Sequence, residues 1–158
     1  NKGCSPIRAG GALDAMMVEQ GRAVYVYNKT RETFVATEAT VADSYVRRLV
    51  GLLGKTPRWA QLGSGLWIVP SRGVHTIGML FPIDLIFLNK EKEVVHLEEY
   101  IRPFRISRVS LKASSVLEVP PHTIYRSGTQ VGDSFEISAL KARQADREIS
   151  RAPAVAGD

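Results

Sequence analysis

The feature that most limits the fold of this chain is a series of short β-prone segments, each bounded by turn residues. Seven segments combine β-branched, aromatic and aliphatic side chains over lengths typical of strands. They are Ala23–Asn28, Thr33–Thr37, Leu66–Val69, Ile83–Leu88, Val94–Leu97, Ser115–Val119 and Ser134–Ser138. The clearest hairpin signal is the charged turn at residues 89–92, which separates two apolar segments.

One segment departs from this pattern and predicts a short α-helix near residues 40–53. Its apolar side chains recur at helical spacing, at positions 42, 46, 49, 50 and 53. Thr40 followed by Asp43 is a variant of the capping box, and Gly54 is a typical helix stop. Many short strands with one helix favour a mainly-β fold, in the form of a single compact antiparallel barrel or sandwich with the helix at one end.

The chain has the composition of one globular domain. It contains 158 residues, of which 44% are hydrophobic and 23% charged. We expect residues 1–15 to be a flexible leader or expression remnant, residues 16–140 to be the β domain, and residues 141–158 to be a flexible tail. The single cysteine, Cys4, excludes an internal disulfide framework. No apolar run approaches the roughly 20 residues of a membrane-spanning helix.

The net charge is +5, with a pI near 9.6. Residues 16–138 hold 15 basic and 12 acidic side chains, so the core carries +3 and part of the excess lies outside it. The densest basic stretch contains Arg102, Arg105, Arg108 and Lys112, together with Phe104. It could bind nucleic acid or another anionic surface weakly. A solvated edge or loop would have the same composition, and we favour that interpretation.

The most unusual stretch runs from residue 75 to residue 84, where His75, Thr76, Met79 and Asp84 lie in apolar sequence. If Pro82 precedes a strand, Asp84 shares a face with large apolar side chains and needs a partner. His75, Arg48 from the predicted helix, or backbone amides could provide that partner. The structural alternative is that Asp84 accepts hydrogen bonds from a turn and only stabilises the fold.

Catalysis and metal binding have weaker support in the sequence. A His75–Asp84 dyad could act on Thr76 or on a bound water, but no oxyanion donors can be identified. His75, His96 and His122 lack the spacing of a strong metal site. We therefore expect no metal and no cofactor.

Several ordered motifs resemble the domain-of-unknown-function 192 family. They are Arg47–Lys55, Gly65–Pro70, HTIGMLFPIDLIFLN at 75–89, VLEVPPHTI at 116–124 and Gly128–Asp133. The resemblance covers approximately residues 22–138. It implies a single mainly-β domain, jelly-roll-like or barrel-shaped, without an assigned molecular function. Many relatives have a Cys before the His-Thr pair, where Arg72 and Gly73 stand here, and Pro121 replaces a Gly or Ala-Gly step. A thiol-dependent activity is therefore not expected.

The sequence favours a binding protein over an enzyme. We expect an unidentified small molecule or protein partner to bind in a pocket around His75 and Asp84, at the mouth of the barrel. The expected binding residues are Arg48, Trp67, His75, Thr76, Met79, Asp84 and Glu118. A hydrolase using the His75–Asp84 dyad is the alternative, and binding of nucleic acid or an anionic surface through residues 102–112 is the third. We expect a cytoplasmic location, although the family that the chain resembles includes exported forms.

Overall fold

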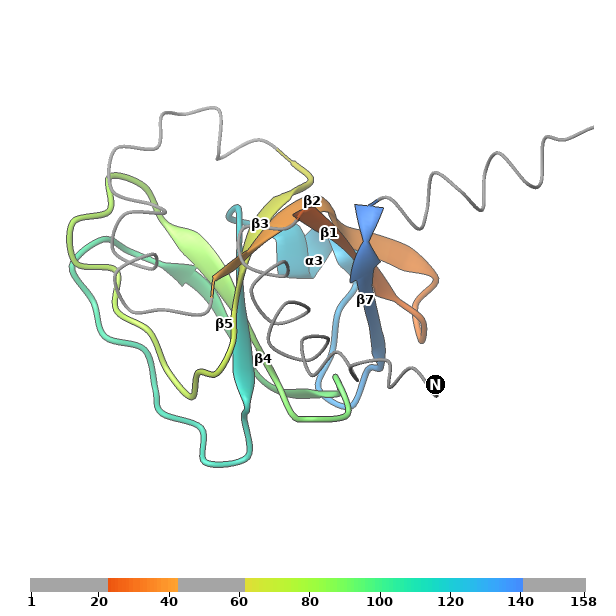
Figure 1. The fold of residues 1–158 in the computed structure, drawn as a ribbon. Helices are drawn as coiled ribbons and strands as arrows, with labels where there is room; N and C mark the ends of the chain where they lie inside the picture. The colour runs from red at the N-terminus through yellow and green to blue at the C-terminus, as the bar shows by residue number, and fades with distance from the viewer. Residues whose placement is uncertain (1–22, 43–61, 141–158) are drawn as a thin grey trace, which may run out of the picture.

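A computed structural model describes residues 23–42 and 62–140. Within these ranges the chain forms seven strands and one short helix (Figure 1). They are β1 (Ala23–Asn28), β2 (Thr33–Ala42), β3 (Ser64–Ile68), β4 (Ile83–Leu88), β5 (Val94–Ile101), β6 (Ser115–Val119), α3 (Thr123–Ser127) and β7 (Phe135–Ala139). The seven predicted strands are confirmed, with β2 and β5 longer than expected. The predicted leader and tail lie outside the described residues.

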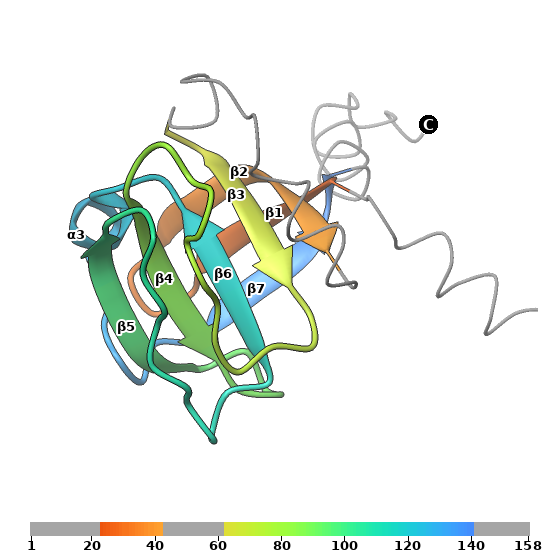
Figure 2. The same ribbon diagram turned by 90° about the vertical axis from the view of Figure 1, so that its left-hand side faces the viewer.

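The strands form one sheet in the order β5-β4-β6-β3-β2-β1-β7 (Figure 2). Its two edge strands meet at one end, where Glu93 bridges Ser134 and the Val94 amide donates to the Asp133 carbonyl at 2.9 Å. The sheet is therefore a curled half-barrel, which confirms the mainly-β, barrel-like prediction. One detail differs, because β2 and β3 pair in parallel while the other neighbours are antiparallel.

The central strands of the sheet, above all β4 and β6, are buried on both faces. The inner face packs around α3, and their common core includes Val26, Ile86, Leu117 and Ile137 of the sheet and Ile124 of the helix. The outer face forms a second core that includes Leu66, Ile68, Leu85, Phe87 and Val116. All six residues of β4 are buried, because alternate side chains enter the two cores. This explains why β4 is a nearly continuous apolar run interrupted by one carboxylate.

The predicted helix near residues 40–53 is wrong at its start. Thr40, Val41 and Ala42 belong to β2 and pair with β3, so Thr40 is not a helix cap. Residues 43–53 lie outside the described residues. The helix that the structure describes is α3, which ends at Gly128 in the left-handed conformation with φ of 65°. Its five residues are too few to give a 3.6-residue periodicity, so the sequence pattern did not reveal it.

A polar cluster fastens the turn between β1 and β2 to the start of β7. The buried Asp133 carboxylate accepts hydrogen bonds from Asn28 Nδ2 at 2.8 Å, Arg31 Nε at 3.1 Å and the Gln130 amide at 2.9 Å. Burial opposes ionisation of Asp133, but the bonds from Arg31, Asn28 and Gln130 outweigh it, so its pKa lies below the usual value of 3.8. The cluster is therefore stabilised by the ionised carboxylate.

The lowered pKa of Asp133 predicts part of the acid sensitivity of the fold. Because the pKa is lower in the folded chain than in the unfolded chain, the contribution is complete above the unfolded pKa and is lost as pH falls through the folded one. Asp133→Asn should lower the free energy of unfolding by about 1–2 kcal/mol at pH 7 and by less at pH 3. Urea unfolding at both pH values measures this difference. Equal losses at the two pH values would contradict it, and Glu99→Gln, at an exposed position, is the control.

Candidate functional site

Two long segments cover the outer face of the sheet. We call residues 70–82 and 102–114 together the loop layer. Figure 2 shows them crossing in front of β4 and β6 side by side. They run antiparallel and are joined by backbone hydrogen bonds, including Thr76 N to Arg105 O at 2.8 Å and Ser107 N to Val74 O at 2.9 Å. The buried Met79 and Ala113 anchor the layer to the outer core, so it is an integral part of the fold.

Thr76 holds the two segments of the loop layer together. Its side chain is completely buried, and its hydroxyl donates to the Arg102 carbonyl at 2.7 Å and accepts from the Arg105 amide at 2.8 Å. Its own carbonyl accepts from the amide of Phe104, which has a positive φ of 60°. Thr76 was a predicted ligand-binding residue, and the structure uses its polar groups to fix this turn.

Asp84 lies on the opposite side of the sheet from the loop layer. It alternates with Ile83 and Leu85, which face the outer core, and is completely buried on the inner face. Its Oδ1 accepts from the Tyr100 amide at 2.9 Å, and its Oδ2 accepts from the Ile124 amide of α3 at 3.0 Å. The carboxylate thus satisfies backbone donors of β5 and α3, as in the structural alternative considered from the sequence.

The predicted pocket residues are divided between the two faces of the sheet. His75 belongs to the loop layer, where it forms a bridge with Ile106, so the structure does not join it to Asp84 as a dyad. Met79 and Glu118 are also on the outer side, with Glu118 between Leu66 and Leu85. Trp67 packs against the inner core, and Arg48 lies outside the described residues. Within residues 23–42 and 62–140, the predicted site residues are therefore divided between the two sides of the sheet.

The outward side of the loop layer has an unusual composition. It carries six of the eleven large apolar side chains that are exposed in the described ranges, and Leu80, Ile106 and Leu111 are 81%, 77% and 80% exposed. The other three are Ile77, Phe104 and Val109. Five exposed cations lie among them, namely Arg72, Arg102, Arg105, Arg108 and Lys112. The two segments contain no Asp or Glu, so this surface is both apolar and uniformly cationic.

Sequence reasoning identified only part of this surface. The alternation of cationic and apolar residues from 102 to 112 was visible, but an exposed edge or loop explained it equally well. What could not be predicted was its pairing with residues 70–82, because that contact depends on how both segments cross the outer core.

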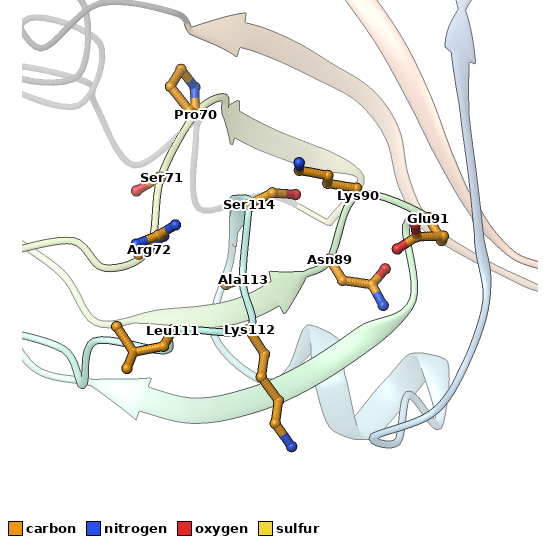
Figure 3. A pocket seen from close by; sticks show the side chains of 10 residues that line it. All are labelled: Pro70, Ser71, Arg72, Asn89, Lys90, Glu91, Leu111, Lys112, Ala113 and Ser114. Atoms are coloured by element: carbon orange, nitrogen blue, oxygen red, sulfur yellow. The ribbon is translucent and has the colours of Figure 1, made fainter.

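An open hollow of about 620 Å³ lies at one end of the loop layer. Its lining comes from three segments, which follow β3, connect β4 to β5, and precede β6 (Figure 3). The lining residues are Pro70, Ser71, Arg72, Asn89, Lys90, Glu91, Leu111, Lys112, Ala113 and Ser114. Leu111 and Lys112 belong to the 102–112 stretch that the sequence offered as an anionic-surface site, whereas the other lining residues were not predicted, because the three segments are separated in the sequence and none has a recognisable binding motif.

The histidines do not gather into a common site. His96 Nε2 lies 3.2 Å from Glu98 Oε1 and its ring contacts Phe87, whereas the His122 ring contacts Tyr100 near α3. Within residues 23–42 and 62–140, no group of three or more His, Cys, Asp or Glu side chains is placed to hold a metal ion.

Comparison with known proteins decides the family. The model of DUF192, described as "Uncharacterized ACR", matches residues 26–137 and thus includes all the strands except the first residues of β1 and the last residues of β7. The chain belongs to the DUF192 family. A UPF0127 protein of Pyrococcus furiosus is 31% identical over 114 residues, covering 69% of this chain and 94% of that protein. A UPF0127 protein of Pyrococcus horikoshii is 30% identical over 100 residues, covering 60% of this chain and 83% of that protein.

Solved structures show the same DUF192 fold. A protein of unknown function from Novosphingobium aromaticivorans has a TM-score of 0.59 at 20% identity, over 72% of this chain and 83% of that chain. A Sinorhizobium meliloti protein, provisionally described as a transcription regulator, has a TM-score of 0.58 at 20% identity, over 73% of this chain and 92% of that chain. At this identity the likeness concerns the fold alone. In the present chain, no helix within the described ranges has the length and apolarity needed to cross a membrane.

Proposed function

We propose that this DUF192 domain is a binding domain that attaches to an anionic lipid membrane surface through the outward side of its loop layer. The observation that carries the proposal is the joining of six exposed apolar side chains and five cations, without any acidic residue, on two hydrogen-bonded segments. The loop layer contains both regions that the sequence analysis suggested for partners: the segment around His75 and the anionic-surface stretch at residues 102–112.

The two kinds of side chain match the two parts of a membrane interface. Apolar groups gain free energy by entering the boundary between headgroups and acyl chains, while Lys and Arg are attracted to anionic headgroups. Each cation near such a surface contributes about 1 kcal/mol. A surface acidic residue would oppose this attraction, and the loop layer has none. The composition therefore favours an anionic bilayer over a neutral one.

The loop layer is also preorganised for docking. Thr76 and the backbone hydrogen bonds between the segments hold the exposed side chains on a scaffold that is already folded. Buried Met79 and Ala113 attach that scaffold to the outer core. Binding therefore costs less ordering entropy than it would for a disordered basic segment.

The other functions considered from the sequence have less support. A hydrolytic dyad requires His75 and Asp84 to meet, but both carboxylate oxygens of Asp84 bind backbone amides on the inner face. Nucleic acid would use the same cations, but proteins that bind single strands stack bases on aromatic rings. Phe104 is the one aromatic side chain among the six exposed apolar ones, so aliphatic groups dominate the surface.

A vesicle co-sedimentation experiment tests the proposal. We expect the wild-type chain to bind mixed phosphatidylglycerol–phosphatidylcholine vesicles and to bind vesicles of phosphatidylcholine alone weakly. Combining Leu80→Ser, Ile106→Ser and Leu111→Ser should weaken binding to the mixed vesicles at least about tenfold, because three exposed apolar groups are lost from the interface.

Three exposed apolar residues outside the loop layer provide the matched control. Leu62→Ser, Tyr125→Ser and Val131→Ser together should leave vesicle binding unchanged. The proposal is wrong if the wild-type chain does not bind the mixed vesicles, or if the two triple variants lose binding equally. Binding of a DNA duplex without binding of vesicles would also overturn it and would support the nucleic-acid alternative.

A further inference from the structure

The hollow at the end of the loop layer carries an excess of positive charge. Arg72, Lys90 and Lys112 line it together with a single carboxylate, Glu91. None of the three cations forms an ion pair within the part of the chain that the structure describes. Their charges are thus available to an anionic ligand.

The positions of the cations favour a ligand that enters between two segments. Figure 3 shows Arg72 and Lys90 on opposite sides of the hollow, with Ser114 between them, while the end of Lys112 points away. Arg72 belongs to the loop layer, and Lys90 belongs to the turn between β4 and β5. An anion placed between the two side chains would contact a guanidinium and an ammonium, which is a combination suited to phosphate oxygens.

Backbone hydrogen bonds fix the frame of the hollow. The Ser71 amide donates to the Ser114 carbonyl at 2.9 Å, and the Ser114 amide donates to the Leu88 carbonyl at 2.8 Å. The Ser110 amide donates to the Arg72 carbonyl at 2.8 Å. The three lining segments are therefore held at fixed separations, and only the long cationic side chains need to be ordered when an anion binds.

We propose that this hollow binds a phosphate ester group, and that its source is the headgroup of an anionic phospholipid. The source of the phosphate rests on the proposed membrane function. The volume of about 620 Å³ is within the range of small-ligand sites. Leu111, which is 80% exposed, lines the hollow and belongs to the apolar surface. A lipid can therefore place its phosphate between Arg72 and Lys90 while its glycerol and acyl groups lie towards Leu111.

The first arm of the test uses soluble probes and the intact chain. Titration with sn-glycerol 3-phosphate, followed by amide NMR shifts, should give saturable shifts at residues 71–72, 89–91 and 112–114. Glycerol should give none. Combining Arg72→Gln and Lys90→Gln should remove the shifts. The proposal is overturned if the shifts are absent, or if they are distributed over exposed cations throughout the chain.

The second arm identifies the source of the phosphate. The Arg72→Gln and Lys90→Gln pair should weaken binding to phosphatidylglycerol-containing vesicles about tenfold or more, because two cations near the surface are lost. Lys29→Gln with Arg126→Gln, which removes two exposed cations outside the loop layer and hollow, should change it less than about twofold. If both pairs change binding by less than about twofold while the wild-type chain binds the vesicles, the headgroup site is overturned but the membrane function stands. Saturable glycerol phosphate shifts without vesicle binding overturn the lipid source and the membrane function together, and support a site for a free phosphate ester.

Discussion

Replacing Asp84 with alanine should lower the free energy of unfolding by about 3–5 kcal/mol, because two buried amides lose their acceptor. The carboxylate is completely buried and binds the amides of Tyr100 and Ile124, which belong to the end of β5 and to α3. Without it, both N–H groups remain in an apolar environment. Tyr100 has a positive φ of 54°, so this part of β5 also depends on a contact that holds its conformation.

Urea unfolding of three variants tests this role of Asp84. Asp84→Asn should cost less than alanine, because its amide oxygen can still accept one of the two hydrogen bonds. Glu99→Ala, at an exposed carboxylate of the same β5 region, should change stability by less than about 0.5 kcal/mol. If Asp84→Ala costs less than about 1 kcal/mol, the structural role is wrong. Loss of a hydrolytic activity in Asp84→Asn, with stability unchanged, would instead restore the catalytic interpretation.

The local pattern of the sequence predicted the sheet well. The hairpin of β4 and β5 was identified from its pattern of an apolar run, a charged turn at residues 89–92 and a second apolar run. This pattern is typical of a β-hairpin. The bounds of β1 and β6 were also as predicted. The parallel pairing of β2 with β3 was not, since it depends on the path of the residues between them and not on either strand alone.

The role of residues 40–42 shows where local reasoning failed. Thr40 and Asp43 have the spacing of a capping box. In the structure, however, Thr40–Ala42 and the two residues before them pair with the five residues of β3. Pairing with a neighbouring strand satisfies the backbone here and overrides a weak capping signal. Such an interaction joins residues far apart in the sequence, so a window of local residues cannot reveal it.

The burial of Asp84 was predicted from the sequence, but the choice among its possible partners was not. Strand alternation placed Asp84 on one face with Ile86 and Leu88, and the structure confirms that Asp84 and Ile86 lie on the inner side. The sequence left His75, Arg48 and backbone amides as possible partners. The structure pairs Asp84 with backbone amides, and the loop layer carries His75 to the outer side. Which side of a sheet a long connection covers is decided by tertiary packing, and no spacing rule gives it.

Neutralising the basic stretch should have the largest effect on the proposed membrane binding. Combining Arg102→Gln, Arg105→Gln, Arg108→Gln and Lys112→Gln removes four of the five cations of the loop layer. At about 1 kcal/mol for each cation, affinity for phosphatidylglycerol-containing vesicles should fall roughly a thousandfold at low ionic strength. The loss should be smaller at high ionic strength, because salt already screens the attraction in the wild-type chain.

Intermediate variants make this prediction quantitative. Successive neutralisation should weaken vesicle binding in steps of similar size, since the four side chains are exposed and none forms an ion pair among the described residues. Thermal unfolding should change little for the same reason. Lys29→Gln and Arg126→Gln, which remove exposed cations outside the loop layer, are the charge controls. If those controls weaken binding as much per charge as the loop-layer variants do, attraction is set by net charge and the loop layer is not the docking surface. Stepwise loss confined to the loop layer is the result that local contact with an anionic bilayer requires.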